Sequence, residues 1–134
     1  MEFNNIKAGL TSSMQIVVSN KDTAIFYGSG TLEVFATPAM ISYMEHAAMI
    51  CVDAHLPNEY TTVGTKIDVK HLAATPVGMS VFIEAKLLEV DRKRLLFKVE
   101  AYDQKEKIGE GFHERFIIEK EKFLNKTYSK LAGD

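Results

Sequence analysis

Glu45 and His71 are the residues whose chemical types stand out most from their surroundings. Glu45 lies within a run of Ala, Met and Ile, where a carboxylate is costly unless it is paired, hydrogen-bonded or in contact with water. Carboxylates shielded from water become useful bases near neutral pH. His71 ends an alternating segment, where an imidazole could transfer protons or orient another group. Both residues are therefore candidates for acid–base chemistry.

Each of these candidates also has a simpler structural explanation. Glu45 could share one polar helix stripe with Ser42 and His46 and be solvated there. His71 could be a half-exposed side chain at the end of a strand. Cys51 has no recognisable catalytic partner, and we interpret it as a small residue of a helix core.

Thr37 and Arg115 are weaker candidates on local grounds. Thr37-Pro38 is typical of a helix start, with Thr as the N-cap and Pro as the first helical residue. A hydroxyl at a helix N-terminus can also help to bind a carbonyl oxygen that gains negative charge in a transition state. Arg115 lies in a predicted strand, where most arginines are exposed charges.

We expect no metal ion and no organic cofactor. The remaining histidines, His46, His55 and His113, are not spaced from Cys or carboxylates as metal ligands are. The single cysteine excludes an intrachain disulfide and argues against a Cys-based zinc site within one chain.

One helix and several strands must position these side chains. Residues 38–55 are apolar around most of the helical circumference, which predicts a buried helix. Alternating or β-branched segments predict strands at residues 12–18, 63–71, 79–90, 95–102 and 108–119. Apolar residues recur at helical spacing in the tail, residues 120–131, which predicts a second helix.

This element order predicts an α+β hotdog fold, in which an antiparallel sheet wraps around a central helix. We expect the last four strands to form one antiparallel meander. A single sheet of this kind leaves edge strands and part of the helix exposed, so we expect a homodimer or a dimer of dimers. The 134 residues are too few for a second core, which predicts a single domain over residues 1–134.

Charge and hydropathy narrow the classes of partner. Sixteen Lys and Arg against eighteen Asp and Glu give a net charge of −2, which attracts neither nucleic acid nor an anionic membrane. The longest apolar run, Ala47–Val52, is far shorter than the ~20 residues of a membrane helix. The first residues lack the basic and apolar regions of a secretory signal, so we expect a cytoplasmic location.

Several segments together resemble the fluoroacetyl-CoA thioesterase type of hotdog protein. These segments are Val34–Met40, Met44–Ala47, Val63–Thr65, Val69–Gly78, Ile108–Gly111, His113–Arg115 and Glu121–Phe123. The resemblance implies hydrolysis of an acyl-CoA thioester to a free acid and CoA, without a cofactor. It implies catalytic roles for Thr37, Glu45 and His71, and substrate-binding roles for Gly64 and Arg115. Family members that select fluoroacetyl groups use an aromatic lid that does not align with residues 23–33, so we expect a small acyl group in general.

This resemblance suggests a mechanism with a geometric condition. Thr37 and nearby N–H groups would polarise the thioester carbonyl, Glu45 would act as nucleophile or general base, and His71 would assist proton transfer. The spacing of Thr37 and Glu45 corresponds to about 12 Å along a straight helix, at a rise of 1.5 Å per residue. The chain must therefore fold back, the substrate must span the gap, or the residues must meet across a dimer interface.

Other functions compete with hydrolysis. A hotdog domain could bind acyl-CoA or another small apolar ligand without turnover, and such binding would survive Glu45→Ala. A hotdog hydratase or dehydratase would need Asp and His within one short segment near the helix. The nearest pair, Glu45-His46, has the wrong spacing. A purely structural protein would leave Glu45 unexplained.

Overall fold

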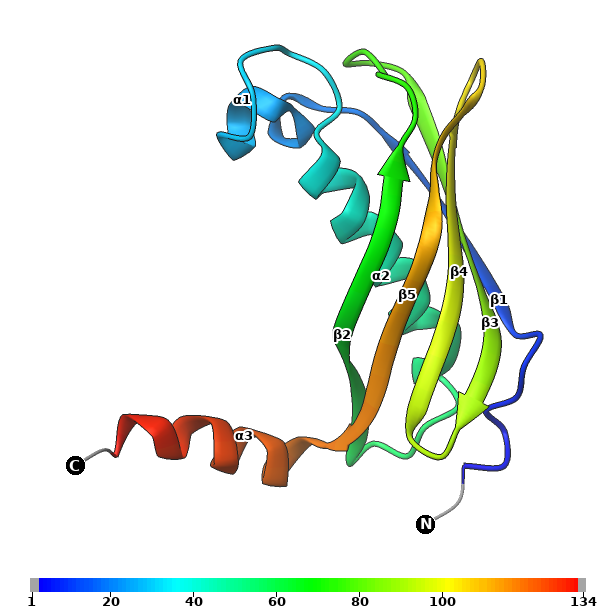
Figure 1. The fold of residues 1–134 in the computed structure, drawn as a ribbon, viewed down its shortest axis with the longest axis vertical. Coiled ribbons are helices and arrows are strands. Elements are labelled where there is room, and N and C mark those ends of the chain that lie inside the picture. Colours follow the sequence, from blue (N-terminus) through cyan, green and yellow to red (C-terminus); the bar gives the residue numbers. More distant parts are fainter. Residues whose placement is uncertain (1–2, 133–134) are drawn as a thin grey trace.

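A five-stranded antiparallel sheet curves around one long helix, α2 (Thr37–Asp53), in a computed structural model that describes residues 3–132 (Figure 1). The strands are β1 (Thr11–Val17), β2 (Tyr60–His71), β3 (Ser80–Asp91), β4 (Arg94–Asp103) and β5 (Lys107–Glu119). The other helices are α1 (Ala24–Tyr27) and α3 (Lys120–Tyr128), with 3₁₀ turns at Asn20–Asp22 and Ser129–Leu131. The predicted sheet and central helix are therefore both present, with boundaries shifted by a few residues.

The position of β2 differs from the expected meander. The strand order is β1-β3-β4-β5-β2, so only β3, β4 and β5 follow one another as hairpins. β2 pairs with β5 at the far edge of the sheet, because β3 already lies between β1 and β4. Residues 72–79 connect the end of β2, at one edge of the sheet, to the start of β3. The Phe35 N–H donates to the Thr75 carbonyl oxygen, which holds this connection beside the start of α2. The prediction of a four-strand meander was therefore wrong for β2.

The core lies between α2 and the inner face of the sheet. α2 buries a stripe of small and flexible side chains: Ala39, Met40, Met44, Ala47, Ala48, Cys51 and Val52. Alternate residues of β3 and β4 face this stripe, as a period-2 strand requires: Val81, Ile83, Ala85, Leu87, Leu95, Phe97, Val99 and Ala101. Gly109 of β5 gives Met40 its place, since a Cβ there would lie 2.5 Å from the Met40 sulfur. The interpretation of Cys51 as a core residue is confirmed.

The sheet covers only one side of α2. Ile41 and Met49 are half-buried, and Ile50 is 39% exposed, on helix positions away from the sheet. The expectation that this helix would be buried on most sides therefore holds only for its sheet-facing stripe in one copy of the chain. Figure 1 shows the sheet curving along one side of α2.

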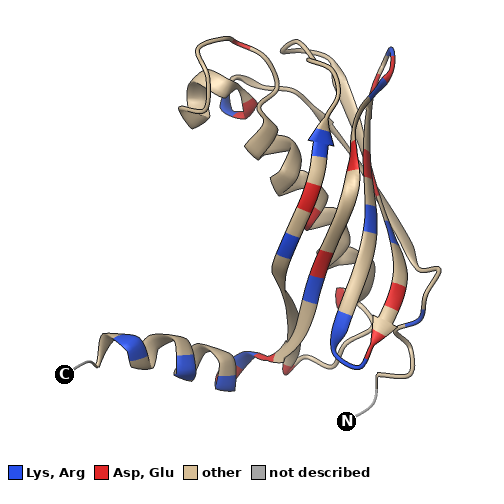
Figure 2. Cartoon of the chain, in the orientation of Figure 1, with Lys and Arg blue, Asp and Glu red and all other residues tan. Residues whose placement is uncertain are grey.

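The C-terminal helix α3 and the distribution of surface charge are the remaining features of the fold. α3 leaves the end of β5 and extends away from the sheet (Figure 1), as the helical spacing of the tail predicted. Figure 2 shows acidic and basic residues interspersed along the strands. Among residues 3–132, no helix is long and apolar enough to cross a membrane.

Candidate active site

Thr37 and His71 form the first of two polar clusters, at the N-terminal end of α2. The Thr37 Oγ1 and the His71 Nδ1 lie 2.7 Å apart, so α2 and the end of β2 are joined by a side-chain hydrogen bond. The N-cap of α2 is Ala36, whose side chain cannot cap. The prediction that Thr37 is the N-cap was therefore wrong. Thr37 is the first helical residue, and its hydroxyl is used by His71 instead.

The second ring nitrogen of His71, Nε2, is the atom of this cluster that could take part in proton transfer. His71 Nε2 is buried and has no hydrogen-bond partner among the residues that the structure describes. Burial lowers the pKa of His71, which favours the neutral ring at neutral pH. A neutral imidazole with one free nitrogen can accept or deliver a proton. A cavity of about 410 Å³ opens beside Thr37 and His71, with Phe35 and Ala73 also in its wall.

The buried ring of Phe35 packs against the His71 ring. Phe35 meets His71 edge to face at 6.3 Å between ring centroids, and stacks on Tyr43 of α2 at 6.2 Å. The Tyr43 hydroxyl donates to Asp22 Oδ1 at 2.7 Å. Burial, and then this bond to Asp22, raise the pKa of Tyr43 to about 12. The 3₁₀ turn before α1 is thereby tied to the helix that carries Thr37.

The second cluster forms around Gly64 of β2, near the middle of α2. A Cβ on Gly64 would lie 3.2 Å from His113 Cε1, 3.4 Å from Arg115 Nη1 and 3.6 Å from Glu45 Oε1. Three polar side chains therefore lie close together beside Gly64, which has no side chain. Glu45 is half-buried and lines a cavity of about 290 Å³ together with Gly64 and His113. Gly64 is thus needed for space, since any side chain would enter this cavity.

An irregularity in β2 accompanies this arrangement. The pairing of β2 with β5 shifts between Gly64 and Lys66, so that Thr65 is an extra residue in the strand. Such bulges bend a strand and redirect its side chains, and they are common next to active sites. Gly64 is aligned with Arg115 immediately before the shift.

Arg115 is a buried cation held by neutral groups. It is only 6% exposed, and its Nε and Nη2 donate to the hydroxyl and carbonyl oxygens of Thr62 at 2.8 and 2.9 Å. Burial lowers the pKa of Arg115, while the charges of Glu45 and Asp53 oppose that shift. The local alternative, an exposed strand charge, does not hold for Arg115, and the guanidinium faces the same space as Glu45.

His113 is the member of this cluster that sequence reasoning ranked too low. The spacing of His113 and Arg115 contained the missing signal. Residues two apart in a strand share one face, so a buried Arg115 implies a buried His113. The structure places both within the sheet's inner side, with 1% and 6% exposure.

The structure does not bring all the predicted residues together within one chain. Thr37 meets His71, and Glu45 meets Gly64 and Arg115, but the two clusters lie at different positions along β2. The seven steps from Gly64 to His71 correspond to about 23 Å of strand. Thr37 also belongs to the regular helix, so the chain does not fold back to reach Glu45. Of the three solutions to the spacing problem, a spanning substrate and a dimer interface are left.

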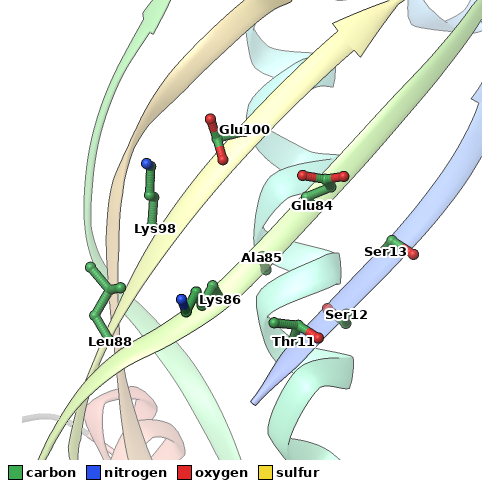
Figure 3. A pocket seen from close by; sticks show the side chains of 9 residues that line it. All are labelled: Thr11, Ser12, Ser13, Glu84, Ala85, Lys86, Leu88, Lys98 and Glu100. Carbon is green, nitrogen blue, oxygen red and sulfur yellow. The ribbon is translucent and has the colours of Figure 1, made fainter. Parts of the chain in front are cut away.

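A hollow larger than either of these two cavities lies elsewhere. A depression of about 680 Å³ crosses β1, β3 and β4, and it contains none of the predicted site residues (Figure 3). Charges of both signs line it: Glu84, Lys86 and Lys98 are exposed, and Glu100 is half-buried. Glu84 and Lys86 alternate with the buried residues that face α2, so this hollow is on the outer face of the sheet. Among residues 3–132, no three His, Cys, Asp or Glu side chains gather as metal ligands would.

Known proteins resemble this chain along most of its length. The family model described as fluoroacetyl-CoA-specific thioesterase matches residues 18–121. The fluoroacetyl-CoA thioesterase of Streptantibioticus cattleyicolor is 42% identical over 101 residues, which are 75% of this chain and 73% of that protein.

Solved structures agree with this match. The fluoroacetyl-CoA thioesterase FlK superposes with a TM-score of 0.88 at 35% identity, over 93% of this chain and 97% of that one. A hot-dog-like protein from Thermanaerovibrio acidaminovorans shares the fold, with a TM-score of 0.90 at 24% identity over both whole chains. The predicted hotdog fold and the predicted resemblance are both confirmed. This chain belongs to the fluoroacetyl-CoA-specific thioesterase family of hotdog proteins.

Proposed function

We propose that this protein hydrolyses the thioester of a small acyl-CoA to the free acid and CoA. The observation that carries the proposal is the 2.7 Å contact between Thr37 and His71 at the start of α2, beside a cavity. It places a hydroxyl, a neutral imidazole and the positive end of a helix at one point. Family membership supports the same reaction class, because the named relatives act on fluoroacetyl-CoA.

The proposed mechanism divides the work between the two clusters. The Thr37 hydroxyl and the free N–H groups of the first turn of α2 bind the carbonyl oxygen as it gains negative charge. Glu45 attacks the carbonyl carbon, or removes a proton from the water that attacks it. The C–S bond then breaks and CoA leaves as a thiolate. If Glu45 is the nucleophile, water next hydrolyses the acyl–Glu45 anhydride, which releases the free acid and restores the Glu45 carboxylate. In either case the neutral His71 ring accepts at Nε2 the proton released by the attacking water and passes it to the CoA sulfur.

Gly64 and Arg115 take the substrate-binding roles in this proposal. Gly64 leaves room for the acyl group in the 290 Å³ cavity beside Glu45. Arg115 Nη1 borders the same space and can donate to an oxygen or another electronegative atom of the substrate. The mechanism requires neither a metal ion nor an organic cofactor, because a thiolate is already a good leaving group.

We further propose a homodimer that shares the site between two copies of the chain. The outer edge of β2 has no partner strand in the described part of the chain. If two β2 strands paired antiparallel around a two-fold axis midway between Gly64 and His71, each His71 would face the partner's Gly64. The two clusters, which lie about 12 Å apart along α2 within one chain, would then form two complete sites. The half-covered face of α2 beside β2 supports the same interface.

A single domain over residues 1–134 and a cytoplasmic location complete the proposal. The described elements share one core, which supports the single domain.

Free-thiol release from a panel of acyl-CoAs tests the function directly. The panel runs from acetyl to medium-chain groups and includes branched and substituted acetyl groups. Wild type should turn over short members, while Glu45→Ala and His71→Ala should abolish turnover. His55→Ala and Glu59→Ala are matched controls at exposed positions and should behave as wild type. Saturable binding of acyl-CoA without turnover by wild type would instead favour a binding module, and turnover that survives both substitutions would refute the assigned roles.

A further inference from the structure

His113 is the buried titratable residue that the proposed mechanism leaves unused. It lies on β5 with 1% of its surface exposed, and both of its ring nitrogens have partners. Nδ1 lies 2.7 Å from the carbonyl oxygen of Lys66, and Nε2 lies 3.2 Å from Arg115 Nη1. One imidazole thus connects the bulged segment of β2 to the buried guanidinium.

These two partners determine the protonation state of the ring. A carbonyl oxygen can only accept a hydrogen bond, so Nδ1 must carry the hydrogen. A guanidinium can only donate, so Nε2 must present its lone pair. A proton on Nε2 would remove the bond and place two cations in contact. Burial lowers the pKa of His113, which acts in the same direction.

Arg115 depends on His113 for the placement of one nitrogen in particular. Thr62 holds Nε and Nη2, which lie on the side of the guanidinium away from His113. Nη1 is the nitrogen 3.4 Å from the Cβ position of Gly64, and among the described residues its hydrogen-bond partner is His113. Because the guanidinium is planar, a hydrogen bond from one Nη1 hydrogen to His113 also fixes the direction of the other Nη1 hydrogen.

We infer that His113 is a positioning residue for the thioesterase reaction. Its unprotonated Nε2 holds Nη1 of Arg115 beside Gly64 and Glu45, where Nη1 can bind the acyl portion of the substrate. The inference rests on the function proposed above. The alternative is that His113 only fills space against Phe97, whose ring lies 6.3 Å away between centroids.

Two amide variants separate these roles. In His113→Gln the longer side chain brings an oxygen to the position of Nε2, so the acceptor for Arg115 is kept. In His113→Asn the shorter amide can still donate to the Lys66 carbonyl, but it cannot reach Arg115. We expect kcat/KM to fall about tenfold or more for Asn, the effect of losing one charge-assisted hydrogen bond, and to stay within about threefold of wild type for Gln.

A double-substitution cycle guards against a general loss of structure. If His113 acts through Arg115, His113→Asn should cause no further loss of kcat/KM in an Arg115→Met background. Thermal unfolding of each variant reports the packing cost separately. Equal activity of the Asn and Gln variants, or an undiminished effect of Asn in the Arg115→Met background, would overturn the inference.

A nitrogen-15 NMR measurement keeps the inference testable if wild type hydrolyses no acyl-CoA, which would refute the proposed function alone. The His113 ring should show a protonated Nδ1 and an unprotonated Nε2 at neutral pH. The Arg115 Nη1 hydrogens should exchange slowly with water in wild type and in His113→Gln, and faster in His113→Asn. A protonated Nε2, or exchange that is the same in all three proteins, would contradict the positioning role.

Discussion

Two heterodimers with opposite expected activities test whether the site is shared between copies. In the first, one chain carries Glu45→Ala and the other carries His71→Ala. In the second, one chain is wild type and the other carries both substitutions. Chains with different affinity tags, expressed together and purified through both tags, give each heterodimer free of the homodimers.

The expected values follow from the separation of the two clusters. Within one chain, Glu45 lies about 12 Å along α2 from Thr37, the partner of His71, so Glu45 and His71 of one chain do not contact each other. If each site takes Glu45 from one copy and His71 from the other, the first heterodimer has one site with both substitutions and one intact site. It should show about half the wild-type turnover per dimer. The second heterodimer has one defect in each site and should be inactive.

Steady-state thiol release at saturating acyl-CoA measures both values, with the two parent homodimers as inactive references. The reverse pattern, an inactive first heterodimer and a half-active second one, would show that each chain holds a complete site. That result would refute the shared-site proposal, and the substrate would then have to span the two clusters of one chain.

Three further predictions concern the clusters themselves. Gly64→Ala should lower kcat/KM about tenfold, because its Cβ would lie 3.2 Å from His113 Cε1 inside the cavity, while circular dichroism stays unchanged. Tyr43→Phe should lower the free energy of unfolding in urea by about 1 kcal/mol, since Asp22 loses the 2.7 Å hydrogen bond; an unchanged urea midpoint would contradict the anchoring role. Burial lowers the pKa values of His71 and His113 in the folded protein. As pH falls below about 6.5, the unfolded chain therefore binds more protons than the folded one. The free energy of unfolding, measured by urea titration, should decrease in this pH range. A stability that rises with acidification from pH 7 to pH 5 would show that the folded state favours charged histidines.

The sequence was informative where a residue contradicted its own neighbourhood. Glu45 and His71 were identifiable because a carboxylate in an apolar helix and a histidine at the end of an alternating strand are both unusual. Thr37 was correctly placed at the start of a helix, but the predicted N-cap role was wrong. Local capping preferences place a Thr before Pro at the N-cap, but they cannot include a histidine that is distant in the chain and adjacent in space. Ala36 takes the N-cap position, and the hydroxyl is left for His71.

Long-range pairing explains the other misses. β2 lies at the edge of the sheet because β1 pairs with the side of β3 where β2 would pair in a meander. The residues between β2 and β3 carry no information about this pairing. His113 could be recognised only through Arg115, which the family resemblance indicated but no local pattern did. The sequence around a single arginine in a strand does not reveal whether the arginine is buried. Near the end of a strand, its side chain can point toward the apolar face of the sheet or toward the solvent.

The burial of Arg115 supports the proposed role of the Gly64 cluster in substrate binding, because burying this cation is costly for stability. A buried cation loses its hydration, and neutral partners such as Thr62 and His113 compensate for that loss only in part. An apolar side chain of similar volume would pack into the same space at a lower cost in free energy. The chain instead places a guanidinium next to a half-buried carboxylate, with an unsubstituted Gly64 between them. Because Arg115 and Glu45 are held apart, each can still bind another polar group. A substrate located between them would need both interactions.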